Sequence, residues 1–259
     1  MLILCGWVTV REKGNIMNKK NLWAVIHTGT RNGSENMGYD AQLLQDLEEA
    51  KQPTLHLYRW QGNTATYGHF IDPFAFLSKK GVENRGLTLA RRPTGGGIIF
   101  HLWDLAFSVA VPASSPHYSV NTLDNYAFVN EAVLQAATEF LQSKAPLEMI
   151  PEDFLARDVS CKRFCMAQPT KYDVVFQGRK IAGAAQRKTK YGFLHQGTIS
   201  LMLPCRDYLE EVLLPHSDVL GAMLANTYPL LGFNAHEDQL DIARQDLEQL
   251  LIKYVTRET

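Results

Sequence analysis

The feature that most constrains this chain is a run of three glycines in "RRPTGGGIIFH", the segment from Arg91 to His101. A glycine in or beside a β-strand costs backbone entropy and adds no side chain to the packing. Three glycines before a β-branched run therefore indicate a close approach that Cβ atoms would prevent. A bulged edge strand or a wide turn is the plainer explanation, but the flanking arginines and histidine favour a ligand lying along bare backbone.

A second segment, "GRKIAGAAQR", contains a lysine in front of several small residues. Lys180 follows a predicted turn, and the strand after it carries Gly183, Ala184 and Ala185, which leave a channel instead of filling a core. A lysine after Gly-Arg is usually solvated, so Lys180 alone indicates a surface turn. Its place before the small-residue strand makes it a candidate for reaching into a tunnel.

Two cysteines, Cys161 and Cys165, lie in "SCKRFCMAQPTKYD". A zinc site requires further Cys or His ligands at regular spacing, which the sequence does not supply, so no metal is predicted. The usual alternative is an inert buried cysteine, but neighbouring basic residues favour a thiolate, the nucleophilic form. Cys165 is a candidate nucleophile and Cys161 its rival. His101 and His195 alternate with apolar residues, which fits either core or ligand-binding histidines.

The composition excludes several classes of protein. The chain has 259 residues, of which 46% are hydrophobic and 20% charged, as in an ordinary globular protein. A formal net charge of −1 excludes a strongly basic nucleic-acid binder, and no apolar run reaches the ~18 residues of a membrane span. The four cysteines are too irregular for a disulfide framework. We expect a cytoplasmic monomer that binds neither nucleic acid nor membrane.

Hydrophobic periodicity predicts strands and helices without regular alternation, which favours an α+β fold of mixed or antiparallel sheets packed with helices. Strands are expected at 21–29 and 54–60, one or two within 97–112, and a three-stranded meander over 171–203. Helices are expected over 34–50, with Ser34 as N-cap, over 121–141, and from about residue 205 onward. We predict an N-terminal extension over 1–18 and one domain over 19–259, ending in a helical segment (about 206–259); the resemblance described next implies that this domain is catalytic.

These segments together resemble the lipoate–protein ligase and octanoyltransferase family, which has the biotin/lipoate ligase fold. The resemblance runs from about Asn21 to Pro204 and rests on "SENMGYDAQLL", "LYRWQGNTATYG", the glycine triplet and "GRKIAGAAQRKTKYGFLHQGTISL". It implies a tunnel for an acyl chain of octanoyl length, which Cβ atoms at the glycines would obstruct. The residues that match the family's substrate-binding motifs are Arg91, Gly95, Gly96, Gly97, His101, Gly183, Ala184, His195 and Gly197.

The family contains two chemistries. Its ligases activate free lipoate with ATP and usually carry a further C-terminal domain, whereas its transferases hold the acyl group on a cysteine. Cys165, followed by Pro169, Tyr172 and Asp173, resembles the nucleophile segment of the cysteine-dependent Gram-positive-type octanoyltransferases. The resemblance implies that Lys180 faces the acyl carbonyl and, with Cys165, is catalytic.

The resemblance implies transfer of an octanoyl or lipoyl group from a carrier-protein thioester, through a Cys165 acyl-enzyme, to a lysine of a lipoyl domain. The partners would be an octanoyl-loaded acyl carrier protein and lipoyl domains of 2-oxoacid dehydrogenase complexes or the glycine cleavage H protein, with no cofactor required. Three alternatives stay open: a ligase that uses ATP and Mg, an amidotransferase between lipoyl-domain proteins, and a non-enzymatic acyl-binding protein.

Two features depart from the family pattern. The family has an adjacent His-Asp pair after the glycine strand, but here His101 is followed by Leu102 and the acid comes only at Asp104. "GII" also stands where "GAV" is commoner. Both departures fall at the expected mouth of the tunnel.

Overall fold

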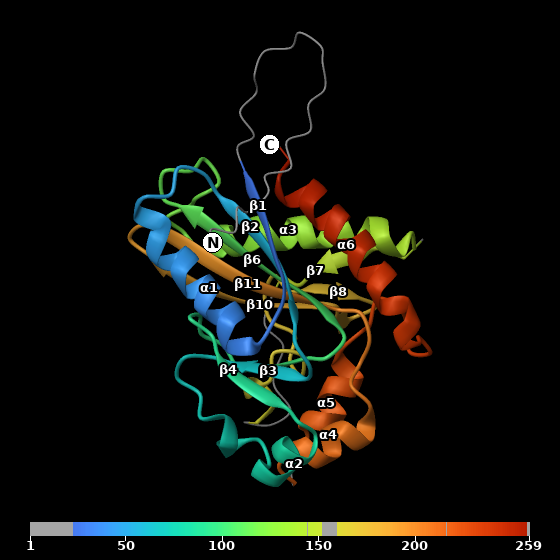
Figure 1. Cartoon of the computed structure of the whole chain (residues 1–259). Helices are drawn as coiled ribbons and strands as arrows, with labels where there is room; N and C mark the ends of the chain where they lie inside the picture. The colour runs from blue at the N-terminus through green and yellow to red at the C-terminus, as the bar shows by residue number, and fades with distance from the viewer. Residues whose placement is uncertain (1–22, 144, 152–159, 216, 258–259) are drawn as a thin grey trace, which may run out of the picture.

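The main sheet of this protein has five strands in the order β1-β2-β6-β11-β10 (Figure 1). The computed structural model describes residues 23–143, 145–151, 160–215 and 217–257. The strands are β1 (Ala24–Arg31), β2 (Thr54–Trp60), β6 (Asp104–Pro112), β10 (Ala182–Thr189) and β11 (Gly192–Ser200). β1 and β2 pair in parallel, and the other pairs are antiparallel. The predicted extension over residues 1–18 lies outside the described residues.

Helices cover both faces of the main sheet (Figure 1). On one face lies α1 (Gly33–Gln45), where Leu44 packs with Leu194 of β11. On the other face lie α3 (Thr122–Leu141) and the C-terminal α6 (Leu240–Val255), which share a large apolar core with the sheet. Burial of these apolar faces supplies most of the driving force for folding.

Two small sheets and several short helices complete the fold. One sheet has the order β4-β3-β5 and the other β7-β8-β9. Their strands are β3 (Thr64–Tyr67), β4 (Thr88–Arg91), β5 (Ile98–His101), β7 (Leu147–Met149), β8 (Val174–Phe176) and β9 (Arg179–Lys180). The short helices are α2 (Lys79–Asn84), α4 (Arg206–Val212), α5 (Val219–Asn226) and the 3-10 turns η1 (Asp46–Glu48), η2 (Pro73–Ala75), η3 (Cys161–Arg163) and η4 (Glu237–Gln239).

A second apolar core anchors the cysteine segment. Cys161 and Phe164 pack in it with Ile98 of β5, Leu209 of α4 and Met223 of α5. A parallel bridge between Ile98 and Phe164 ties the same segment to the strand that follows the glycines. Residues about seventy positions apart in the chain are thereby brought side by side.

This arrangement confirms the predicted α+β class, corrects two details and decides between one and two strands within 97–112. The N-cap of α1 is Asn32 and not Ser34, because the Asn32 side chain accepts a hydrogen bond from the Glu35 N–H (2.9 Å) while Glu35 accepts from the Asn32 N–H (3.2 Å). Residues 97–112 form two strands, β5 and β6. The predicted three-stranded meander has four strands, because Ile181 interrupts it where the chain passes from the small sheet to the main sheet.

Candidate active site

An apolar pocket lies where the main sheet, the β4-β3-β5 sheet and α1 meet. We call it the acyl pocket, after the acyl chain that the resemblance implies as its ligand. It is lined by Met37, Tyr58, Trp60, Thr66, Arg92, Ile99, His101, Cys165, Gly183, Ala184, Ala185, Gln196, Gly197 and Thr198. The small residues of β10 therefore line a channel, as their sequence predicted.

The glycine triplet contributes to this site in a different way from the one expected. A Cβ atom at Gly97 would overlap the backbone carbonyl of Arg163, in the cysteine segment. Gly96 has a φ of 84°, which favours glycine, whereas a Cβ at Gly95 would meet nothing within 4 Å. None of the three lines the acyl pocket. Glycine is thus required at Gly97 by neighbouring main chain, and a Cβ at Gly96 would point toward Ala185 Cβ (3.5 Å) and Cys165 Sγ (3.9 Å), in residues that line the pocket.

Cys165 lies between the triplet and the pocket. Its N–H donates to the Ile98 carbonyl (3.1 Å), and its Sγ lies 3.9 Å from the position that a Gly96 Cβ would take. It is half-buried and lines the acyl pocket, whereas Cys161 is fully buried in the second core. Of these two cysteines, the structure gives only Cys165 access to the pocket.

Lys180 is buried close to Cys165. Its Nζ forms an ion pair with the Asp173 carboxylate at 2.7 Å. The position of a Gly183 Cβ is 3.4 Å from Lys180 Cε and 3.7 Å from Cys165 Cβ. Lys180 and Cys165 therefore border the same glycine, and the ammonium already has a carboxylate partner.

The buried arginine of the pocket is Arg92, which the sequence analysis did not select. Arg91 is exposed and lies over the Tyr67 ring, 5.7 Å from its centre, whereas Arg92 is 5% exposed and lines the pocket. Burial lowers the pKa of Arg92, and the nearby Cys165 raises it. Strand alternation could have found this residue, because Arg92 shares a face with the buried Ala90.

His101 and Asp104 form a hydrogen-bonded pair, although they are not adjacent in the sequence. His101 Nδ1 lies 2.6 Å from Asp104 Oδ2, across the short connection between β5 and β6. His101 Nε2 lies 2.8 Å from Thr66 Oγ1, which accepts a hydrogen bond from Arg92. Thr66 can then donate to Nε2, so that Nδ1 carries the proton donated to Asp104. Leu102 and Trp103, which separate the two residues in the sequence, therefore do not prevent the contact.

His195 and Gly197 match the family motif without presenting side chains to the pocket. His195 is fully buried on the opposite face of β11 from Gln196 and Thr198, which line it. Burial lowers the pKa of His195 to about 3, so the ring is neutral at neutral pH. A Cβ at Gly197 would overlap the Phe107 ring in the main core. The core interpretation of His195 therefore holds.

A buried polar network that the sequence analysis missed holds one wall of the pocket. Gln196 donates to Asp40 of α1 (2.6 Å) and accepts from Thr94 (2.6 Å). Asp40 is fully buried and also accepts from Ser108 (2.6 Å) and contacts His56 (2.8 Å). Satisfied networks of this kind fix side-chain positions. Asp40 lies on the buried face of α1 with Met37 and Leu44, but a charged residue is normally expected on the exposed face of a helix.

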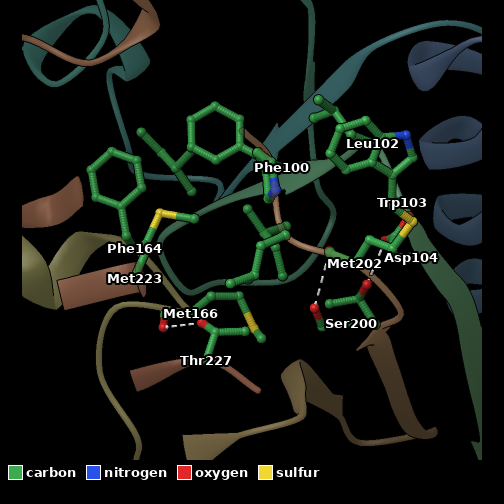
Figure 2. Close-up of a pocket in the computed structure, with 15 residues that line it drawn as sticks. Phe100, Leu102, Trp103, Asp104, Phe164, Met166, Ser200, Met202, Met223 and Thr227 are labelled. Carbon is green, nitrogen blue, oxygen red and sulfur yellow. Dashed lines mark hydrogen bonds between the residues drawn. The ribbon is translucent and has the colours of Figure 1, made fainter. Parts of the chain in front are cut away.

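A second apolar pocket adjoins the acyl pocket (Figure 2). Ile99 and Thr198 line both pockets and so form the partition between them. Around the second pocket Figure 2 shows large apolar side chains, among them Phe100, Phe164 and Met223. The acyl pocket is therefore bounded on this side by two side chains.

The residues that the structure describes contain neither a metal-ligand cluster nor a membrane-spanning helix. Among them, no group of three or more His, Cys, Asp and Glu side chains is placed to hold a metal ion. None of their helices combines the length and apolar character needed to cross a membrane.

The chain matches the family described as lipoyl protein ligase A/B catalytic domain over residues 32–219. It is 30% identical over 188 residues to an octanoyltransferase LipM of Anoxybacillus flavithermus, which covers 71% of this chain and 67% of that protein.

Two solved structures share its fold. A putative lipoate protein ligase of Thermoplasma acidophilum with bound lipoic acid is 22% identical, with a TM-score of 0.62, over 90% of this chain and 85% of that one. A lipoate-protein ligase A bound with ATP is 20% identical, with a TM-score of 0.61, over 91% of this chain and 94% of that one.

Proposed function

Since this chain belongs to the lipoyl protein ligase A/B catalytic domain family, we propose that it is an octanoyltransferase of protein lipoylation in which Cys165 carries the acyl group. The observation that carries this proposal is the place of Cys165. It is half-buried at the wall of an apolar pocket, whereas Cys161 is buried in a core.

The reaction has two steps. In the first, the Cys165 thiolate attacks the carbonyl of an octanoyl thioester, for which we propose octanoyl-acyl carrier protein as donor. A C–S bond forms to Cys165, the C–S bond to the donor breaks, and the donor leaves as a thiolate. The acyl-enzyme then holds the octanoyl chain in the acyl pocket, against the small residues Gly183, Ala184 and Ala185.

In the second step, the neutral amine of a lipoyl-domain lysine attacks this thioester. A C–N bond forms, the C–S bond to Cys165 breaks, and the proton lost by the amine balances the donor thiolate of the first step. A thioester is exchanged for a more stable amide, so the transfer requires no ATP. The ion pair with Asp173 and the position beside Gly183 support a role for Lys180 in orienting the acyl carbonyl.

The test is a mass measurement after mixing the protein with octanoyl-acyl carrier protein in the absence of ATP. We expect an octanoyl adduct on the peptide that contains Cys165. The adduct should be lost in Cys165→Ala and kept in Cys161→Ala, the matched control four residues away.

An adduct that persists in Cys165→Ala would exclude this nucleophile. Octanoylation of a lipoyl domain only with ATP and free acid would establish the ligase chemistry instead. Transfer from an octanoylated lipoyl-domain protein, with none from the carrier protein, would identify an amidotransferase.

A further inference from the structure

Two buried cations lie near Cys165, and only one of them has a carboxylate partner. Lys180 is paired with Asp173 at 2.7 Å. Arg92, which is 5% exposed, forms no ion pair with a carboxylate of the described chain. A buried charge without a counter-ion is costly, so such a cation indicates an anion that is present in the working enzyme.

The hydrogen bonds of Arg92 fix its guanidinium beside the sulfur. Nη1 donates to Thr66 Oγ1 (2.8 Å), and Nη2 donates to the carbonyls of Gly95 (3.0 Å) and Gly97 (2.7 Å). The Cys165 side chain is near enough to raise the pKa of Arg92. Both partners flank Gly96, where the position of a Cβ lies 3.2 Å from Arg92 Nη2 and 3.9 Å from Cys165 Sγ.

One donor of the guanidinium is unused. Arg92 Nε is buried and has no hydrogen-bond acceptor within the described structure. Arg92 lines the acyl pocket, so a bound acyl group would lie next to the guanidinium that carries this unused N–H. Thr66 in turn contacts His101, and His101 contacts Asp104, so a chain of buried polar side chains holds the guanidinium in place.

We propose that Arg92 is a catalytic residue of the acyl transfer: its guanidinium is the counter-ion of the Cys165 thiolate, and its Nε–H stabilises the oxyanion formed when the thiolate attacks the thioester. This inference rests on the proposed function for the acyl step only, because the thiolate pair exists without substrate. Lys180 is neutralised by Asp173, so it orients the acyl group and is not the counter-ion of the thiolate.

The charged and titratable groups around the thiol come from several elements. They are Arg92 after β4, Asp173 before β8, Lys180 of β9, Tyr126 of α3, Tyr58 of β2 and His101 of β5. Burial raises the pKa values of Tyr58 and Tyr126, so both phenols stay neutral near neutral pH. Arg92 is therefore the unneutralised cation of this set.

The first test measures alkylation of Cys165 by iodoacetamide at pH 6.5 and 8.5, by peptide mass spectrometry without any acyl donor. A thiol of ordinary pKa, ~8.5, loses about fiftyfold of its thiolate over this interval. A nearby opposite charge lowers a pKa by about 1–3 units, so the Cys165 rate should fall by less than about tenfold. The exposed Cys205 of the same chain is the internal reference.

The second test compares variants by the same measurement. Arg92→Gln should give Cys165 the pH dependence of Cys205, Arg92→Lys should keep most of the parental behaviour, and Arg91→Gln, which removes the neighbouring exposed charge, should keep all of it. Arg92→Lys lacks the Nε–H, so its octanoyl adduct should form at least about tenfold more slowly than in the parent.

Either of two results would overturn the inference. One is an alkylation rate of Cys165 that depends on pH in the same way as that of Cys205 in the parent protein, a result that requires no variant. The other is a folded Arg92→Gln variant in which the alkylation of Cys165 keeps the pH dependence of the parent. Absence of an octanoyl adduct in the parent, with the Arg92 effect on alkylation intact, would refute the proposed function and leave the ion pair standing. An octanoyl adduct on Cys165 in the parent, with no effect of Arg92→Gln on alkylation, would refute this inference and support the proposed function.

Discussion

At the scale of single residues, the glycines of the triplet have different surroundings although they look alike in sequence. Gly97 faces the carbonyl of Arg163 so closely that a Cβ would overlap it, and Gly96 adopts a left-handed φ, while Gly95 faces open space. The close approach predicted from the triplet therefore exists. Its partner is the segment that carries Cys165, and no local pattern could have identified a partner that distant in the chain.

Gly97→Ala should consequently act on both stability and chemistry. The added methyl must push Arg163 away, which costs about 1–3 kcal/mol of unfolding free energy and shifts Cys165 from the pocket. Urea unfolding and the rate of octanoyl-adduct formation measure the two effects. Gly95→Ala is the matched control for stability and should change the unfolding free energy by less than about 0.5 kcal/mol. Equal stabilities of the two variants would contradict this account of the triplet.

At the scale of elements, strand β5 separates two apolar pockets. Ile99 lines both of them, whereas its neighbour Ile98 lines only the second. The same strand pairs with β3 and bridges the cysteine segment at Ile98. One short strand thus sets the end wall of the acyl pocket and the position of the nucleophile.

Ile99→Ala should therefore relax the selection of acyl-chain length. Joining the pockets gives two further methylenes an apolar environment, worth ~0.8 kcal/mol each, so decanoyl relative to octanoyl transfer should improve by about tenfold in kcat/KM. Ile98→Ala removes the same atoms from the same strand without opening the partition, and its preference should stay parental. A preference unchanged in Ile99→Ala, with transfer still measurable, would show that another group ends the pocket.

Element boundaries illustrate what periodicity does and does not predict. On the C-terminal helix, a helical repeat in the sequence fits a stripe of Leu240, Ala243, Leu247, Leu250 and Tyr254. In the structure the stripe continues from Leu247 through Leu251 and Val255 instead. Both choices fit a helical repeat, since 3.6 residues per turn allows a step of three or four. The core beneath α3 decides between them, and that core is a tertiary feature.

At the scale of the whole molecule, the α+β class and the residues that carry the resemblance followed from the sequence, but their arrangement did not. Cys165 and Lys180 border one glycine. Arg92, and not Arg91, lines the pocket, and His195 lies on the core side of β11. A motif shows which residue types occur together in the sequence, and it does not show where their side chains point. Which face each side chain takes depends on strand register and on packing across the sheets.

The burial of His195 between the sheet and α3 makes the stability of the whole fold depend on pH. Its pKa in the folded protein is about 3, below the ordinary value of 6.5, because burial disfavours the charged ring. Between these two pH values the unfolded chain binds a proton that the folded chain does not. The contribution of His195 to stability is therefore complete above about pH 6.5 and is lost as the pH falls toward 3, by ~1.4 kcal/mol per pH unit.

Comparing variants isolates this single titration from the many carboxylates that also respond to acid. His195→Leu removes the buried ring, including an Nε2 that has no partner in the described structure. Its unfolding free energy, relative to the parent, should improve by about 2 kcal/mol between pH 7 and pH 5, measured by urea unfolding at each pH. His27→Leu, at an exposed position of β1, should leave this difference almost constant. If the difference in unfolding free energy between the parent and His195→Leu does not change over this pH interval, the folded protein accommodates the protonated ring. Water or a carboxylate would then reach the space between β11 and α3.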